Sequence, residues 1–383
     1  FIYRGLSLNS RHIDWHMFSE VSMRQYMKDE IRERLQMIRD TAESADGRCI
    51  TPSHETLLHL AASRGLGDVY KRQLQRHADP NVQIILPQQA FPSIPDSEQG
   101  NTPLTYACQP GMDDSTPLPV HNRISCLNLL IQYGADVNKP GPLGWPPLVI
   151  TCVAGIGGAP YEEAALFLLK CGADISLQPE LKGKKTSLLT WATAAGYPLL
   201  VRKLCEAGYD PNFRGEMDPP LLSLNLNTPN TALQIAHILL EYGADVNAAM
   251  PASTTLPETT GDTALLNLCR QLAFIDVSQL PQIRELVSLF ISEGADVNHQ
   301  NAAGETPLMA CCRGMLLGDD SLDRLKLGIA RLLLDHRADP SLRDKYGRTA
   351  LQRIGNRSNE HLQMVLKYLP ELSAPPLPKK ENR

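Results

Sequence analysis

Apolar residues in this chain recur at every third or fourth position within short runs, and turn-forming residues separate one run from the next. Two such runs are CLNLL at residues 126–130 and ARLLL at residues 330–334. This spacing places the apolar side chains on one face of a helix. The sequence therefore predicts many short helices between residues 53 and 369, with leucines such as Leu240 and Leu333 in the core.

Two short motifs recur on either side of these runs. The first reads Gly-Ala-Asp-x-Asn and occurs at residues 134–138, 243–247 and 294–298, with looser copies at 77–81, 172–175, 208–212 and 337–340. The second reads Gly-x-Thr-Pro-Leu and occurs at residues 100–104 and 304–308, with variants at 261–265 and 347–351. So many copies in one chain indicate an array of repeated units.

Each motif has a local structural meaning. The Thr of the second motif can cap the free N–H groups at a helix start, and Pro is tolerated at the first helical position. The Gly of the first motif suits a helix end, where it adopts the left-handed conformation at little cost. The Asp and Asn that follow favour a turn closed by side-chain hydrogen bonds. Each unit is thus expected to be a helix, a turn, a second helix and a turn-rich connection.

These motifs resemble those of the ankyrin repeat family over most of the chain, from about Ser53 to Leu369. The family's Thr-Pro-Leu-His helix start is present in degraded form at residues 56–59. The resemblance implies an all-α fold, an ankyrin-repeat solenoid of about eight helix-turn-helix units with hairpin-like connections and an N-terminal helix. The units are expected to open at Thr56, Thr102, Pro146, Thr186, Pro219, Thr263, Thr306 and Thr349.

The array departs from the family pattern in two ways. Fifty-seven residues separate the turn residues Asp79 and Asp136, against a family period of about 33 residues. The first unit also has Arg72 and Gln73 where its second helix should carry leucines, which indicates either a polar capping repeat or a local sequence error. The predicted insertions centre on residues 82–99, 109–121, 248–260, 273–282 and 314–323.

The predicted domain organisation has three parts. Residues 53–369 form the ankyrin repeat array. Residues 1–52 form an N-terminal helical segment, in which residues 17–43 read as an amphipathic helix that either covers the end of the array or belongs to an upstream domain. The first residue is Phe1 and not Met, so the true N-terminus is expected upstream. The Pro-containing residues 370–383 are expected to form a disordered tail.

Composition narrows the classes of function. Of 383 residues, 37 are Lys or Arg and 42 are Asp or Glu, which gives a net charge of −5, and 5% are aromatic. Neither value suits a nucleic-acid-binding surface, and no apolar run is long enough to span a membrane. The nine cysteines, an odd number spread along a long chain, indicate free thiols in a reducing compartment. We therefore expect a cytoplasmic location, with the nucleus as the alternative.

Motifs that carry catalytic chemistry were not found. The chain has no Walker loop, no Gly-x-Ser-x-Gly elbow and no paired metal-ligand motif. Four cysteines occupy equivalent positions about one repeat apart, too far for disulfides and without the convergence that zinc requires. They are interpreted as small buried residues, and His59 as a framework residue; the four are Cys108, Cys152, Cys269 and Cys312. The chain is thus predicted to be no enzyme and to hold no cofactor or metal.

The predicted function is the binding of other proteins. The resemblance implies a non-catalytic scaffold or adaptor that contacts its partners through the hairpin tips and the concave face. Two alternatives stay open. The chain could be the regulatory or substrate-recruiting part of a larger enzyme or ubiquitin-ligase subunit, or it could be a secreted effector of a microbe or parasite.

The expected partner-binding residues lie on the tips. Trp145 follows Gly144 and is expected to face solvent, where an aromatic side chain can anchor a partner. The alternative is that Trp145 folds back over the adjacent Pro-rich connection and staples it. Tyr346 lies on a later tip beside Arg343 and Lys345. The remaining candidates are polar tip residues: Asn138, His299 and Asn301.

Overall fold

The structure is a computed structural model in which helices pack in pairs. It describes residues 57–63, 67–84, 100–109, 120–156, 161–176, 180–181, 184–213, 219–251, 259–272, 280–313, 320–354, 366–367 and 369–373. The chain divides into two compact units, one of residues 1–155 and 159–183 and the other of residues 156–158 and 184–383. The helix expected at 17–43, most of the expected insertions and residues 374–383 lie outside the described residues.

The first unit contains three helix pairs in its described part. The pairs are α2 (Leu57–Ser63) with α3 (Gly67–Gln75), α4 (Pro103–Cys108) with α5 (Val120–Gln132), and α6 (Pro147–Gly155) with α7 (Glu162–Lys170). Helix α4 packs against both α2 and α6, and α5 packs against both α3 and α7. First helices thus form one layer and second helices another. The unit also contains the 3-10 helix η3 (Pro142–Gly144) and the short strand β1 (Glu180–Leu181).

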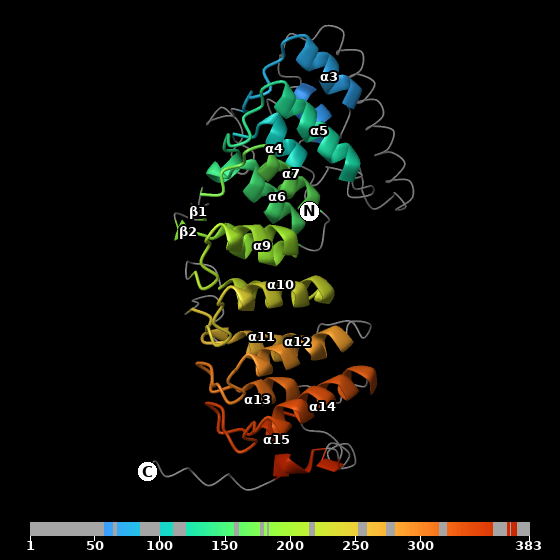
Figure 1. Cartoon of the computed structure of the whole chain (residues 1–383). Coiled ribbons are helices and arrows are strands. Elements are labelled where there is room, and N and C mark those ends of the chain that lie inside the picture. The colour runs from blue at the N-terminus through green and yellow to red at the C-terminus, as the bar shows by residue number, and fades with distance from the viewer. Residues whose placement is uncertain are drawn as a thin grey trace, which may run out of the picture. The chain divides into compact units, whose positions relative to one another are not determined.

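The second unit repeats this two-layer arrangement, as its successive helices show in Figure 1. One layer contains α8 (Leu188–Ala195), the 3-10 helix η4 (Pro220–Ser223), α11 (Ala264–Gln271), α13 (Pro307–Cys312) and α15 (Ala350–Arg353). The other contains α9 (Pro198–Glu206), α10 (Pro229–Glu241), α12 (Leu280–Ser292) and α14 (Asp320–Asp335). Strand β2 (Lys184–Lys185) precedes α8, and the 3-10 helix η8 (Pro370–Ser373) packs on α15. The all-α repeat fold predicted from the sequence is confirmed.

The threonines of the Gly-x-Thr motif cap the first helices as predicted. The hydroxyl of Thr102 accepts the N–H of Thr105 at 3.2 Å, and the hydroxyl of Thr306 accepts the N–H of Met309 at 3.2 Å. The unit that opens at Pro219 differs, because its first helix is the 3-10 helix η4 and not an α-helix. There the carboxamide of Asn225 accepts the N–H of Asn227, a local turn that competes with helix continuation.

Most second helices bury a leucine four residues before the turn. At that position Leu130, Leu239 and Leu333 are fully buried. Leu240, which was expected in the core, is only half-buried, because one helical step of about 100° rotates it away from the position that Leu239 fills. Gln73 occupies the same position in α3 and is 2% exposed.

The four equivalent cysteines are buried in the first-helix layer. Cys108 and Cys152 lie in the first unit, Cys269 and Cys312 lie in the second, and none is more than 1% exposed. All eight cysteines that the structure describes are free thiols. His59 is also buried, and its Nε2 lies 3.0 Å from the carbonyl oxygen of Asn101. These positions confirm the interpretation of the cysteines and of His59 as framework residues.

One further property of the helices concerns membranes. Within the described ranges, no helix combines the length and the apolar character that crossing a lipid bilayer requires.

Candidate functional site

Asn138, one of the expected tip residues, joins two repeats. Its Nδ2 donates to the carbonyl of Gly172 at 3.1 Å, and its Oδ1 accepts the N–H of Asp174 at 2.7 Å. Asp136 closes the local turn by accepting the N–H of Asn138 at 2.8 Å. In the Gly-Ala-Asp-x-Asn motif the Asp therefore forms the turn, whereas the Asn reaches the next repeat. The side chain of Asn138 is engaged by the fold.

Four other asparagines make the same bridge. Each donates to the carbonyl of the first residue of the next turn motif, two residues beyond the second helix, and accepts the N–H of the aspartate two residues later. These residues are Asn81, Asn212, Asn247 and Asn298. Ser176 stands at the equivalent place in the first unit, and its hydroxyl donates within its own turn to Asp174 at 2.7 Å.

Asn301 and His299 also serve the fold. Asn301 is 6% exposed, and its Oδ1 accepts the N–H groups of Ala303 and Glu305, both at 2.9 Å. Its Nδ2 donates to the carboxylate of Asp262 at 2.7 Å. The Nε2 of His299 lies 2.7 Å from the carbonyl oxygen of Gly261. Both side chains therefore hold one tip against the preceding tip.

The expectation that Trp145 faces solvent is wrong, because its side chain is only 9% exposed. Trp145 follows Gly144, and the residue at that place is also buried in three other repeats: Asn101, Asp262 and Glu305 are at most 2% exposed. The residue that precedes the glycine takes the outward position instead. Leu143 occupies it in this tip and is 55% exposed.

Tyr346 holds the outward position in the last tip, residues 343–348, and is 67% exposed. The guanidinium of Arg348 lies 4.8 Å from the centre of its ring, and the ammonium of Lys345 lies 5.1 Å from it. Arg343 and Lys345 are exposed on the same tip, and Arg343 donates to the carbonyl of Gly347 at 2.7 Å. Of the residues expected to bind a partner, these three come together on one exposed tip: Arg343, Lys345 and Tyr346.

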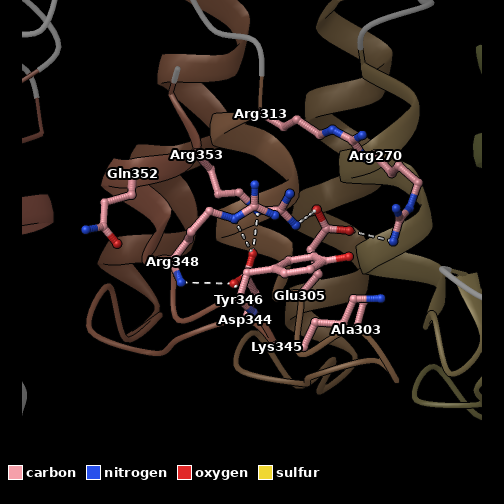
Figure 2. Close-up of a pocket in the computed structure, with 10 residues that line it drawn as sticks. All are labelled: Arg270, Ala303, Glu305, Arg313, Asp344, Lys345, Tyr346, Arg348, Gln352 and Arg353. Atoms are coloured by element: carbon pink, nitrogen blue, oxygen red, sulfur yellow. Dashed lines mark hydrogen bonds and ion pairs between the residues drawn. The ribbon is translucent and has the colours of Figure 1, made fainter. Parts of the chain in front are cut away.

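This tip forms one wall of a pocket in the second unit. Its volume is about 460 Å³. Figure 2 shows arginines from α11 and α15, together with Arg313 at the end of α13, converging on the side of the pocket opposite Lys345. The residues that line it are Arg270, Ala303, Glu305, Arg313, Asp344, Lys345, Tyr346, Arg348, Gln352 and Arg353.

Buried ion pairs build the inner wall of the pocket. Glu305 is 2% exposed and contacts both Arg270, at 2.7 Å, and Arg353. Arg270 also contacts Asp262 at 3.0 Å. Buried charges of this kind are stable only when each is paired and hydrogen-bonded. Because Arg270 lies in α11 and Arg353 in α15, the carboxylate of Glu305 links successive repeats.

Asp344 anchors the exposed tip. Its carboxylate accepts the N–H groups of Tyr346 and Arg348, both at 2.9 Å, and contacts Arg348 at 3.0 Å and Arg353 at 3.3 Å. Burial opposes the ionisation of Asp344, but these N–H groups and the Arg348 guanidinium outweigh it and lower the pKa. Asp344 therefore stays charged and fixes the loop that presents Tyr346.

Asp262 behaves differently, although it also contacts an arginine. It is fully buried, and this burial raises its pKa despite the opposing effects of Asn301 and Arg270. The nearby carboxylate of Glu305 raises it further. Asp262 and Glu305 thus share Arg270.

Sequence reasoning did not identify the arginines and acids of this pocket. One signal was available: the variable residue of the Gly-x-Thr motif, which is Asp262, Glu305 or Arg348 in the last three units. This position is charged there, whereas Asn101 occupies it in the second unit. The partners of these residues lie in other repeats, so their pairing is not visible from spacing along the chain.

Two buried cations at equivalent places in α5 and α14 were also missed. Arg123 donates to the carbonyls of Ala107 and Gln109, the latter at 2.7 Å, and Lys326 donates to the carbonyl of Arg313 at 3.3 Å. Each is 1% exposed. Both cations satisfy carbonyl groups at the end of a first helix, where the helix dipole favours positive charge.

Comparison with known protein families identifies the repeat. A family model described as "Ankyrin repeats (3 copies)" matches residues 274–374, and one described as "Ankyrin repeat" matches residues 99–141. The first match includes the pocket residues from Ala303 to Arg353.

Several curated proteins are similar to parts of this chain. "Protein phosphatase 1 regulatory subunit 27" of Homo sapiens is 39% identical over 51 residues, which are 13% of this chain and 30% of that protein. "Putative ankyrin repeat protein YahD" of Escherichia coli (strain K12) is 28% identical over 52% of this chain and 85% of its own length. "Putative ankyrin repeat protein FPV031" of Fowlpox virus (strain NVSL) is 28% identical over 46% of this chain and 44% of its own length. This chain thus spans under a third of the phosphatase subunit that it matches.

A solved structure, that of the human ASB11 ankyrin repeat domain, is also similar. The likeness has a TM-score of 0.45 with 20% sequence identity and covers 71% of this chain and 96% of that chain.

Proposed function

Because the chain is an ankyrin repeat protein, we propose that it is a non-catalytic module that binds other proteins as a scaffold or adaptor. We further propose that it contacts a partner through the last tip, with Tyr346 as the anchor and with Arg343 and Lys345 beside it. The observation that carries this proposal is the 67% exposure of the Tyr346 side chain on a tip whose backbone is held by Asp344.

An exposed aromatic ring gains binding free energy when a partner covers it. Tyrosine, tryptophan and arginine dominate binding free energy at protein interfaces, because they bury a large area with few rotatable bonds. The hydrogen bonds from the N–H groups of Tyr346 and Arg348 to Asp344 fix the tip before a partner arrives. Such preorganisation lowers the entropy lost on association. The tip is thus suited to bind without rearrangement.

The other tip residues are left out of the proposed contact. Asn138, His299 and Asn301 are engaged in hydrogen bonds between segments of the fold, and Trp145 exposes little of its side chain. Substituting them would alter the scaffold together with any interface. The proposed contact is therefore limited to Arg343, Lys345 and Tyr346.

The similar proteins support the assignment of ankyrin repeats and a role in protein binding, but they do not indicate a particular partner. The printed name of the human relative describes a regulatory subunit of a phosphatase, which is consistent with a protein-binding role. Its similarity covers only 13% of this chain, so we do not extend the phosphatase to this protein. As part of the proposal we place the protein in the cytoplasm, with the nucleus as the alternative. The free thiols of the described cysteines suit a reducing compartment.

The test is affinity purification with the full chain, followed by binding measurements on the purified partner. Tyr346→Ala is expected to weaken the binding free energy of the partner by about 2 kcal/mol or more. Tyr133→Ala is the matched control, because Tyr133 is an exposed tyrosine (39%) near the C-terminal end of a second helix, outside the tips. Equal binding by both variants, with unchanged unfolding midpoints, would remove Tyr346 from the interface.

A further inference from the structure

The pocket beside Tyr346 carries an excess of positive charge. Five of its lining side chains are cationic, whereas Glu305 and Asp344 are its two carboxylates. Figure 2 shows both carboxylates on the inner wall, with Arg353 joined to each of them. The net charge of the pocket therefore comes from the cations that form no ion pair with these two acids.

Three arginines are engaged by the fold. Arg270 contacts Asp262 and Glu305, Arg353 contacts Glu305 and Asp344, and Arg348 contacts Asp344. Three carboxylates thus balance three guanidinium groups. The inner wall is close to neutral, and it contributes hydrogen-bond donors more than net charge.

Arg313 and Lys345 are the cations that remain. Both are exposed at the pocket, and no described carboxylate lies within ion-pair distance of either side chain. Arg313 directly follows α13 and Lys345 lies on the tip. An anion that enters the pocket would meet both charges without displacing an ion pair between described side chains.

We propose that this pocket binds an acidic segment of a protein partner, in which Asp or Glu side chains pair with Arg313 and Lys345 and an adjacent side chain packs on Tyr346. The inference rests on the proposed protein-binding function and adds the chemistry of the partner. A volume of about 460 Å³ exceeds what one carboxylate fills and suits a short stretch of peptide. Arginine binds carboxylates in a planar, two-pronged geometry, which favours such a segment.

Nucleic acid is the competing ligand class, and the pocket disfavours it. Because ion pairs leave the inner wall nearly neutral, only Arg313 and Lys345 offer net positive charge, too little for a continuous row of phosphates. A short acidic peptide can place its few charges opposite Arg313 and Lys345. The net charge of −5 for the whole chain also works against a polyanion, which senses charge beyond a single pocket.

The test uses a fluorescent synthetic peptide of glutamates around one tyrosine and measures its binding to the full chain by anisotropy. The double variant R313E/K345E is expected to weaken this binding at least ~10-fold, because it reverses both free charges. The same peptide with glutamines in place of glutamates should bind at least ~10-fold more weakly to the unaltered chain. Added salt should weaken binding of the glutamate peptide to the unaltered chain, since the contacts are exposed.

A charge-matched control is K203E/R284E. Lys203 lies in α9 and Arg284 in α12, both are exposed in the same unit, and neither lines the pocket. This control should bind the glutamate peptide within about twofold of the unaltered chain, because salt screens exposed charges that do not contact the peptide. Unfolding midpoints of all variants are compared first. If the double pocket variant is destabilised, K345E alone serves, since Lys345 is an exposed tip residue.

Three outcomes would overturn the inference. They are an equal loss of peptide binding in K203E/R284E, undiminished binding of the glutamine peptide, and tighter binding of a single-stranded oligonucleotide at the same pocket residues. The failure of the proposed function is distinguishable, because it is tested with a captured natural partner. If R313E/K345E retains that partner and Tyr346→Ala loses it, the protein-binding function stands and the acidic-segment inference falls.

Discussion

The guanidinium of Arg353 lies against the carboxylate of Glu305, a residue 48 positions earlier in the chain. The two side chains are 11% and 2% exposed. Glu305 directly precedes the helix-capping Thr306, whereas Arg353 ends α15. Because Arg270 of α11 contacts the same carboxylate, one buried acid holds neighbouring repeats together behind the proposed binding tip.

Removal of that acid should destabilise the second unit. Glu305→Ala leaves Arg270 and Arg353 without their shared partner in a buried site, and we expect a loss of about 3–5 kcal/mol in the free energy of unfolding. Chemical denaturation measures it. Glu241→Ala is the control, because Glu241 forms an exposed pair with Arg202 and should change stability by at most about 1 kcal/mol. Similar effects for both substitutions would show that the network does not hold the repeats.

Leu333 and Leu240 form a matched pair of core and half-buried leucines. Leu333→Ala removes a fully buried side chain and should cost about 2–5 kcal/mol. Leu240→Ala should cost clearly less, since Leu239 takes the core position in α10. Urea unfolding followed by circular dichroism compares the two. An equal loss for both variants would contradict the register of the second helices.

Local features of the fold were predictable from the sequence because their causes are local. Thr102, Thr263 and Thr306 cap helices through groups three residues away. By contrast, the bridge from Asn138 to Gly172 depends on how far apart consecutive repeats pack. The sequence indicated that Asn follows Asp in a turn, but it did not indicate that the amide reaches the next repeat.

The error over Trp145 has a similar origin. Trp145 was assigned to the outward position because it is aromatic and lies near a glycine on a tip. In its tip, the residue before the glycine, Leu143, is exposed, and the residue after it, Trp145, is buried. In the last tip Tyr346 likewise precedes the glycine and is exposed, so that part of the candidate site was identified from the sequence. Arg348, which follows that glycine, is partly exposed, because it pairs with Asp344 at the pocket.

Gln73 offers a stabilising substitution in the first unit. It fills the position that Leu130 occupies in α5, and its buried Nε2 has no hydrogen-bond partner among the described residues. An unsatisfied buried amide costs about 1–3 kcal/mol, so Gln73→Leu should raise the free energy of unfolding by a similar amount.

The exposed Gln75 provides the control for this substitution. Gln75→Leu should alter stability by no more than about 0.5 kcal/mol. Thermal and denaturant unfolding of both variants check the prediction. A loss of stability in Gln73→Leu would mean that the amide has a favourable role at this position.

Buried thiols should resist modification in the folded protein. Burial raises the pKa of Cys108 to about 11 and that of Cys269 to about 12. Since the thiolate is the reactive form, both should stay unlabelled by an aromatic disulfide reagent near pH 8 and become labelled on unfolding. Cys171, which is partly exposed, is the internal control. Labelling of Cys108 at the rate of Cys171, measured by peptide mass spectrometry, would contradict the packing of the first helices.

The central claim is that a protein partner contacts the tip that carries Tyr346. The most direct measurement is hydrogen–deuterium exchange of the full chain with and without a purified partner. We predict slower exchange at residues 343–348 and at the end of α13, which together border the pocket. No change is predicted around Trp145, whose side chain the fold encloses. Protection confined to the tip near Trp145, with the last tip unchanged, would contradict the account.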